Sequence, residues 1–329
     1  LSGANLKRDG GKTVSHMELA SRLESTDEFK TFFSWNTNPL ASAPDQTRLR
    51  QALKREDLFT VVCDVFMTDT ARYADIVLPA ASFLEFDDLT FSYFHYHMGV
   101  QTKTSEPMGE ALPNPEIFRR LARALGFDEP ALLESDDAML AKMMTQMNCG
   151  FGLDELKTRG YFPLDDQVLN FWSALEFETP SGRIEIASEG AEEMGLPRVP
   201  QPWADGELSA DQFRLLSPAS KWRLNDSYAN DPNIDERAGG ASVHLNPGDA
   251  ARLGLADGSA VELVNAAGRI ELTARLTDAV LEGTAVSYKG RWPSVEMNGK
   301  NINFVHQAKS ADMGDSTSVH STTVEIRAL

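Results

Sequence analysis

Cysteine is scarce in this sequence, with only 2 among 329 residues. These two, Cys63 and Cys149, lie far apart, so no Cys-x-x-Cys pair is present. Without such a pair, the chain cannot build an iron–sulfur cluster or a structural zinc site from its own thiolates. Cys63 ends the apolar run 58–63, which predicts a buried strand. Because free cysteines are among the most buried residues, we expect an inert core thiol there.

Histidine is also scarce, and His95 and His97 form the only close pair among 6 histidines. In a strand, a His-x-His pair places both side chains on one face, where they can bind a metal ion. Solvent-exposed and core histidines are far commoner than metal ligands, so we assign no metal site to this pair.

Positive charge is in deficit, since 31 Lys and Arg stand against 49 Asp and Glu and give a formal net charge of -18. Such a surface repels phosphate backbones and argues against nucleic acid as the main partner. A local pocket can still bind one small phosphorylated ligand.

No run of 18 apolar residues is present, so the sequence predicts no membrane span. The chain opens at Leu1 without a methionine or an apolar signal, and we expect an internal piece or a processed chain.

The first part of the chain alternates apolar runs rich in branched residues with helix-like segments. Strands are predicted at 29–35, 58–64 and 76–78, and helices at 15–23, 46–55, 114–126 and 137–147. Asn114-Pro115-Glu116 supplies three helix-start signals, with Asn114 as the expected capping residue. The methionines of the last helix are expected to pack in the core. This order of elements predicts an α/β domain with a parallel sheet.

The second part of the chain reads as mostly β. Prolines and a glycine make 196–208 a stiff connector, so we expect one domain over 1–200 and another over 208–329. Short strands are predicted at 213–216, 242–245, 260–264, 270–274, 285–288 and 323–326, with one helix at 247–253 and a hairpin turn at 264–269. Six strands in this length are enough to close a small barrel.

Three polar segments follow predicted strands, namely 36–39, 64–71 and 217–227. In open α/β sheets, loops at the carboxyl ends of strands present backbone amides and short side chains to ligands. Asp64 can accept hydrogen bonds from a ribose or a purine amino group, and the cations beside Trp222 suit an anionic heterocycle. The alternative is structural, because Asn, Asp and Pro also favour turns and caps. From these residues alone, the chain is a two-domain protein that binds a nucleotide-like ligand.

Taken in order, these segments resemble the molybdopterin oxidoreductase family, which contains dimethyl sulfoxide reductases, formate dehydrogenases and nitrate reductases. Residues 35–39 (WNTNP) look like a strand followed by Gly-Thr-Asn-Pro, and 64–78 (DVFMTDTARYADIVL) is similar to the family's polar loop and its ADIVLP sequence. Residues 179–185 match a strand that closes the α/β domain, and 301–303 match a late loop near a pterin. Residues 217–227 and 245–258 look like the dinucleotide-binding barrel. Asp88 departs from the pattern, since relatives usually carry glycine there, and this makes the substrate hard to infer.

The resemblance implies a partial Rossmann-like sheet with helices, followed by a six-stranded barrel of the double-psi type. It also implies a molybdenum or tungsten bis(pterin guanine dinucleotide) cofactor. One nucleotide arm would contact Asn36, Thr37, Asn38, Asp64, Thr68 and Thr70. A pterin or the other arm would contact Ser217, Ser220, Lys221, Asn225, Ser227 and Asn303.

By the same resemblance, the iron–sulfur cysteines and the metal ligand lie upstream of this chain, so we assign it no catalytic residue and no metal ligand. The expected activity is redox chemistry or oxygen-atom transfer on a small substrate, in an enzyme completed by its upstream half and served by an iron–sulfur electron-transfer partner. Two alternatives stay open. The chain is either a nucleotide-binding module without catalysis or a subunit that completes its site with another chain.

Overall fold

The computed structural model describes residues 12–164, 175–202 and 206–329. The chain forms two compact units. One comprises 1–11, 63–66 and 78–199, and the other comprises 12–62, 67–77 and 200–329. These units are defined by which residues pack together, and each contains several separate stretches of the sequence. They do not test the division into domains at 1–200 and 208–329, which stays a prediction.

The predicted parallel sheet is confirmed. Its strands are β1 (Thr31–Trp35), β2 (Phe59–Asp64) and β3 (Ile76–Pro79), in the order β1-β2-β3. Phe59 N donates to Lys30 O where β1 and β2 begin, and Ala80 N donates to Asp64 O where β2 and β3 end, so all three run the same way. The accompanying helices are η2 (His16–Glu18), α1 (Leu19–Glu24), α2 (Pro39–Ser42), α3 (Gln46–Ala52) and η3 (Ala71–Tyr73). Helices α1, α2 and α3 bury Leu23, Leu40 and Leu49, respectively, in one apolar cluster.

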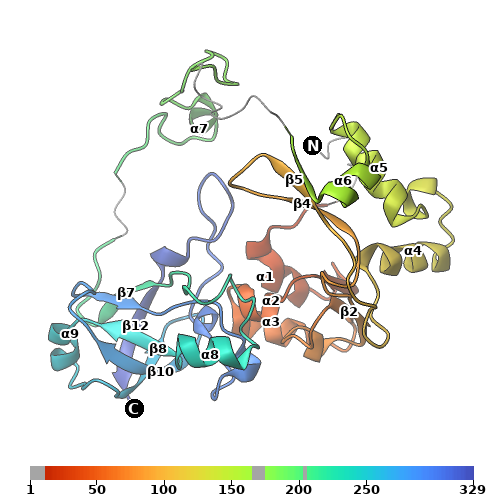
Figure 1. The fold of residues 1–329 in the computed structure, drawn as a ribbon. Helices are drawn as coiled ribbons and strands as arrows, with labels where there is room; N and C mark the ends of the chain where they lie inside the picture. Colours follow the sequence, from red (N-terminus) through yellow and green to blue (C-terminus); the bar gives the residue numbers. More distant parts are fainter. Residues whose placement is uncertain (1–11, 165–174, 203–205) are drawn as a thin grey trace. The chain divides into compact units, whose positions relative to one another are not determined.

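Within the described residues, six strands of the second part close into a barrel, as predicted (Figure 1). The strands are β7 (Gln212–Leu216), β8 (Ser242–Leu245), β9 (Ala260–Val264), β10 (Arg269–Leu276), β11 (Thr284–Val286) and β12 (Thr323–Ala328), arranged β10-β8-β11-β7-β12-β9. Alternate residues such as Phe213 and Leu215 point inward and are fully buried, because side chains alternate between faces of a strand. Helix α9 (Pro247–Arg252) was predicted, whereas α8 (Pro232–Ala238) was missed.

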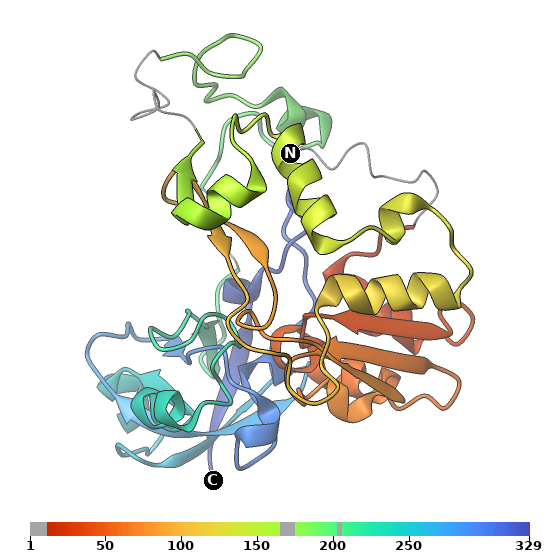
Figure 2. The same ribbon diagram turned by 45° about the vertical axis from the view of Figure 1, so that its right-hand side comes forward.

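A second small sheet was not predicted. It consists of β4 (Asp88–Phe91), β5 (His97–Gln101) and β6 (Tyr161–Pro163), and all its pairings are antiparallel (Figure 2). One face carries Leu89, Met98 and Phe162, which pack with side chains of α5 (Asp136–Gln146) and α6 (Leu153–Arg159). Met143 and Met144 of α5 therefore pack in this core, as expected, and Thr90, His97 and Tyr161 on the other face of the sheet are exposed.

Two local expectations were wrong. Helix α4 (Asn114–Ala124) begins with Asn114 as a helical residue, and Pro113 takes the capping position without a side-chain cap. The Asn114 side chain instead accepts a hydrogen bond from the buried Cys63 thiol at 3.7 Å. Residues 179–185 form a turn and not a strand, because Thr179 Oγ1 donates to Arg183 O and folds this segment back on itself. A short helix, α7 (Glu189–Glu193), follows.

Among the described residues, no helix combines the length and the apolar character needed to cross a membrane.

Candidate functional site

The loop after β1 is tied to the loop after β2 by buried hydrogen bonds. Asn38 Oδ1 accepts from Thr70 N at 3.1 Å and from Thr70 Oγ1 at 2.8 Å. Thr70 Oγ1 in turn accepts from Leu40 N, and Thr68 Oγ1 accepts from Ala71 N. Asn38 and Thr70 thus join the two loops, Thr68 binds within the second loop, and all three predicted site residues are buried.

The neighbouring residues of the first loop face solvent. Asn36 adopts a left-handed backbone conformation with φ of 49°, which asparagine tolerates better than most residues. Asn36 and Thr37 are both exposed, so their side chains are accessible to a ligand. Asp64, at the end of β2, is half-buried, and its Oδ1 accepts from the amides of Val65 and Phe66.

A buried carboxylate lies directly beside these loops and was missed from the sequence. Asp69 is 2% exposed, and its Oδ1 accepts from Ser294 N at 2.8 Å. Burial raises the pKa of Asp69, while the Ser294 amide and the Arg50 guanidinium, 3.8 Å away, partly oppose the rise. Asp226 is affected in the same direction, since burial and the nearby charge of Asp69 raise its pKa. The second oxygen of Asp69 and Nδ2 of Asn38 make no hydrogen bond within the described residues.

In the barrel, Ser217 begins the polar loop 217–227 and is itself buried. Its hydroxyl shares a 2.8 Å hydrogen bond with His306 Nε2, and His306 Nδ1 lies 2.9 Å from Thr322 Oγ1. Burial lowers the pKa of His306 to about 4, so the imidazole is neutral at pH 7. Ser217, predicted as a cofactor residue, thus belongs to a buried Ser-His-Thr arrangement.

The rest of the polar loop borders a cavity of about 400 Å³. Three cationic side chains line it, namely Lys221, Arg223 and Arg291. Arg223 and Arg291 are buried, and they bind Asp235 at 2.6 Å and Glu296 at 2.7 Å. The remaining side chains are those of Ser220, Trp222, Ser242, His244 and Tyr288, together with small residues.

The cavity keeps donor capacity toward a ligand. Burial and the neighbouring Arg291 lower the pKa of Arg223, and Arg223 Nε has no hydrogen-bond partner within the described residues. Lys221 is exposed, and its Nζ lies 4.9 Å from the Trp222 ring centroid. Cations, hydroxyl donors and aromatic faces together suit a ligand that has an anionic group and a flat ring.

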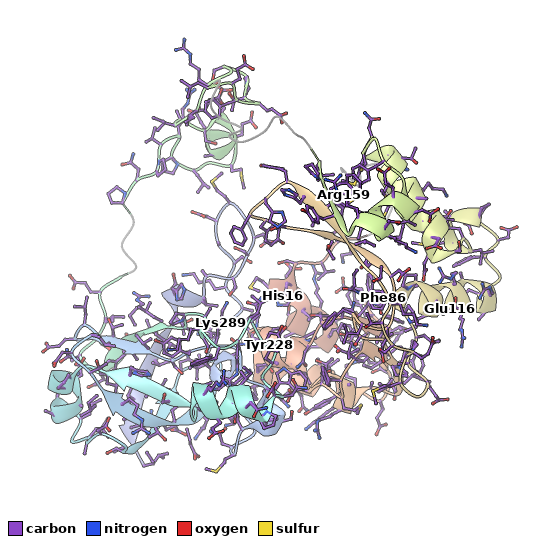
Figure 3. All side chains as sticks on the ribbon, viewed as in Figure 1. His16, Phe86, Glu116, Arg159, Tyr228 and Lys289 are labelled. Atoms are coloured by element: carbon purple, nitrogen blue, oxygen red, sulfur yellow. The ribbon has the colours of Figure 1, made fainter. Side chains whose placement is uncertain are left out.

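Close packing of two barrel loops holds this cavity in shape. A Cβ at Gly290 would lie 2.0 Å from Asn225 O, so only glycine allows these backbones to approach. Trp292 Nε1 donates to Asp226 O at 2.8 Å across the same junction. Figure 3 labels Tyr228 and Lys289, which follow one loop and begin the other. Asn225 itself, with φ of 53°, is exposed.

A late loop connects the barrel to α2 within the same compact unit. Asn301 Nδ2 and Asn303 Nδ2 both donate to Ala41 O at 2.8 Å. The side-chain amide of Asn303, a predicted pterin contact, therefore already donates one hydrogen bond within the protein. Trp292 packs with Ala41 and Ala229 in a small apolar cluster at this junction.

The predicted site residues thus fall into two groups. Asn38, Thr68, Thr70 and Ser217 are buried, and the exposed or half-buried ones are Asn36, Thr37, Asp64, Ser220, Lys221, Asn225, Ser227 and Asn303. Sequence reasoning placed Arg223 in the polar loop but missed the residues that other elements bring to the cavity, above all Arg291 and His244. Alternation along 242–245 would have placed His244 on the outer face of its strand, but no local pattern indicates which loop covers that face.

Comparison with known proteins gives two family matches. Residues 5–124 match the family model described as Molybdopterin oxidoreductase, and residues 213–323 match the model of the Molydopterin dinucleotide binding domain. Probable oxidoreductase YoaE of Bacillus subtilis is 32% identical over 92% of this chain and 45% of its own length. A putative catalytic subunit of dimethyl sulfoxide reductase from Halobacterium salinarum is 29% identical over 96% of this chain and 39% of its own.

Among solved structures, acetylene hydratase from Pelobacter acetylenicus is similar in fold, with a TM-score of 0.78 and 18% identity. The similarity covers 97% of this chain and 47% of that chain. The chain therefore spans less than half the length of these similar proteins.

Proposed function

Because the chain belongs to the molybdopterin oxidoreductase family, we propose that it is the cofactor-binding part of a larger molybdenum or tungsten oxidoreductase. The cofactor would be a bis(pterin guanine dinucleotide), and the activity would be redox chemistry or oxygen-atom transfer on a small substrate. An upstream part would complete the active site and supply the metal ligand, the iron–sulfur cluster and the contact with an electron-transfer partner. When bound, the cofactor supplies the redox chemistry, and the protein supplies binding, orientation and electrostatics.

The observation that carries the proposal is the cation-lined cavity of about 400 Å³ in a chain of net charge -18. A pocket of this size accommodates part of a dinucleotide and not only a small ion. Three cations converge on it, although acids outnumber bases along the chain by 49 to 31. The unpartnered Nε of Arg223 is a buried donor that a phosphate or pterin oxygen would satisfy.

The residues of the cavity would divide the work of binding. Lys221 would balance phosphate charge, since its exposed ammonium can follow a mobile group. Trp222 would offer a ring face, and Ser220 a hydroxyl donor. The other arm would lie against Asn36, Thr37 and Asp64, with Asn38 and Thr70 joining the loops after β1 and β2 and Thr68 holding the second loop in shape.

Guanosine nucleotides titrated into the cofactor-free chain test this binding role. We expect saturable binding of guanosine diphosphate by calorimetry, and weaker binding of guanosine, because the phosphate interactions are absent. Lys221→Ala should weaken the diphosphate about fivefold or more, the effect of losing one charge-assisted contact of about 1 kcal/mol. Lys309→Ala is the matched control, since Lys309 is exposed on the barrel side of the chain and does not line the cavity. Equal losses in both variants, or no saturable binding, would contradict the proposal.

A second function is supported by the position of the cavity, whose lining comes entirely from residues 219–291. A site built by the barrel alone could bind a nucleotide without any catalysis. The two functions differ in the longer protein that contains the upstream part. Elemental analysis of that protein should find molybdenum or tungsten if it is the enzyme, and neither metal if the chain is only a nucleotide-binding module.

A further inference from the structure

The solvent-facing side of the small β4-β5-β6 sheet contains a second cavity, of about 440 Å³. Cross-strand register places Thr90, Gly99 and Tyr161 side by side on the three strands. His97 lies two residues before Gly99 and therefore on the same face. All of the lining residues lie between 90 and 161, and none of them belongs to the proposed cofactor loops. This site therefore does not depend on the function proposed above.

Gly99 forms the floor of this cavity. It is not among the residues with positive φ, so its backbone conformation does not require glycine. Space does require it, because a Cβ there would lie 2.5 Å from Thr90 Oγ1. A glycine at the centre of a three-stranded sheet normally weakens the sheet. Here it leaves the depression open between the side chains of its two neighbours.

Flat rings wall the depression. Tyr161 stands at one side and is about half exposed, whereas the side chain of Phe91, opposite Met98 at the end of β4, belongs to the other face of the sheet. The Tyr161 ring centroid lies 5.7 Å from that of His97, and the His97 centroid lies 5.2 Å from that of His95 in an edge-to-face arrangement. A ligand with an aromatic ring can therefore contact rings on more than one side.

The polar groups of the lining are donors. His95 Nδ1 accepts from His97 N at 3.3 Å, which puts the proton of a neutral His95 on Nε2 and makes that atom a donor. The hydroxyls of Thr90, Ser92 and Tyr161 add further donors, and no carboxylate belongs to the described lining. The nearest acid along β4 is Asp88, two residues before Thr90 on the same face and outside the lining. This composition favours an oxygen acceptor or an anion and disfavours a cationic ligand.

We propose that this cavity binds a small planar aromatic ligand that carries an anionic or phenolic oxygen. The ring would lie over Gly99 beside Tyr161 and His97, and the oxygen would accept hydrogen bonds from the imidazoles and hydroxyls.

The test uses the full 329-residue chain with 4-hydroxybenzoate as probe, observed by NMR. Saturable binding should shift the ring protons of His95 and His97. Cyclohexanecarboxylate, which has the anion without the aromatic ring, should bind at least fivefold more weakly, and benzyltrimethylammonium should not compete. Gly99→Ala should weaken the probe about tenfold or more by filling the floor, and His95→Gln should weaken it severalfold by removing one ring and the fixed position of its Nε2 donor.

Tyr93→Ser is the matched control, because Tyr93 is a fully exposed aromatic residue of the same hairpin and does not line the cavity. Its affinity for the probe should equal that of the unchanged chain. Because Gly99→Ala can also disturb the sheet, thermal unfolding is recorded for each variant, and His95→Gln, at an exposed position, gives a second measure. Absence of saturable binding, equal affinity for the cationic probe, or equal losses in His95→Gln and Tyr93→Ser would overturn the proposal.

Discussion

Gly290→Ala should destabilise the barrel strongly, because two separate penalties meet at this residue. Its φ of 94° lies where side chains are disfavoured, which costs about 1–2 kcal/mol. The added Cβ would also lie 2.0 Å from the Asn225 carbonyl oxygen and 3.2 Å from its carbon. These are backbone atoms of a packed loop, so relief requires the two loops to separate, and overpacking of this kind costs about 1–3 kcal/mol. Together they predict a loss of about 2–5 kcal/mol.

Gly258→Ala separates the two penalties. Gly258 has φ of 86°, close to that of Gly290, but nothing lies within 4 Å of a Cβ built there. The Gly258→Ala variant should therefore lose only the stability that the unfavourable backbone conformation costs, about 1–2 kcal/mol. Chemical denaturation of both variants, followed by tryptophan fluorescence, measures the difference, since Trp292 donates to Asp226 O beside Gly290. The steric argument fails if the two variants lose equal stability. If it holds, Gly290→Ala should also weaken nucleotide binding, because the same loops border the cation-lined cavity.

Two further predictions concern buried ionisable groups. The pKa of His306 is lowered from 6.5 to about 4 by burial, so the unfolded chain binds its proton more readily. The stability that neutral His306 provides is complete above about pH 6.5 and is lost as the pH falls toward 4, by up to about 3 kcal/mol; the pH dependence of unfolding should flatten in His306→Gln. Asp69→Ala removes the acceptor of Ser294 N and should cost about 1–3 kcal/mol, whereas Asp69→Asn keeps an acceptor oxygen and should cost less. Thermal unfolding of the two Asp69 variants at pH 7 checks the order, and equal losses would show that this hydrogen bond does not stabilise the junction.

Regular alternation explains why the elements were predictable. The strand β7 has the burial pattern of alternating half-buried and buried residues that its sequence suggested, and β8 repeats it. Such periods are local, so they can be read from a few consecutive residues. The small β4-β5-β6 sheet escaped prediction because β6 has only three residues and pairs with β5 about 60 positions away in the sequence. A strand of that length carries almost no periodic signal.

The sequence by itself determined where the strands of the parallel sheet and of the barrel occur, which polar loops follow them, and that the second part can close into a barrel. It could not tell which polar side chains face a ligand and which are consumed inside the protein. Asn38 looked like Asn36, yet Asn38 is buried on Thr70, 32 positions away, while Asn36 is exposed. Ser217 looked like Ser220, yet Ser217 is bound to His306, 89 positions away. Only the tertiary structure determined which of these side chains are buried and hydrogen-bonded. A hydrogen bond depends on distance in space, and the residues around a donor do not indicate which distant acceptor the fold brings to it.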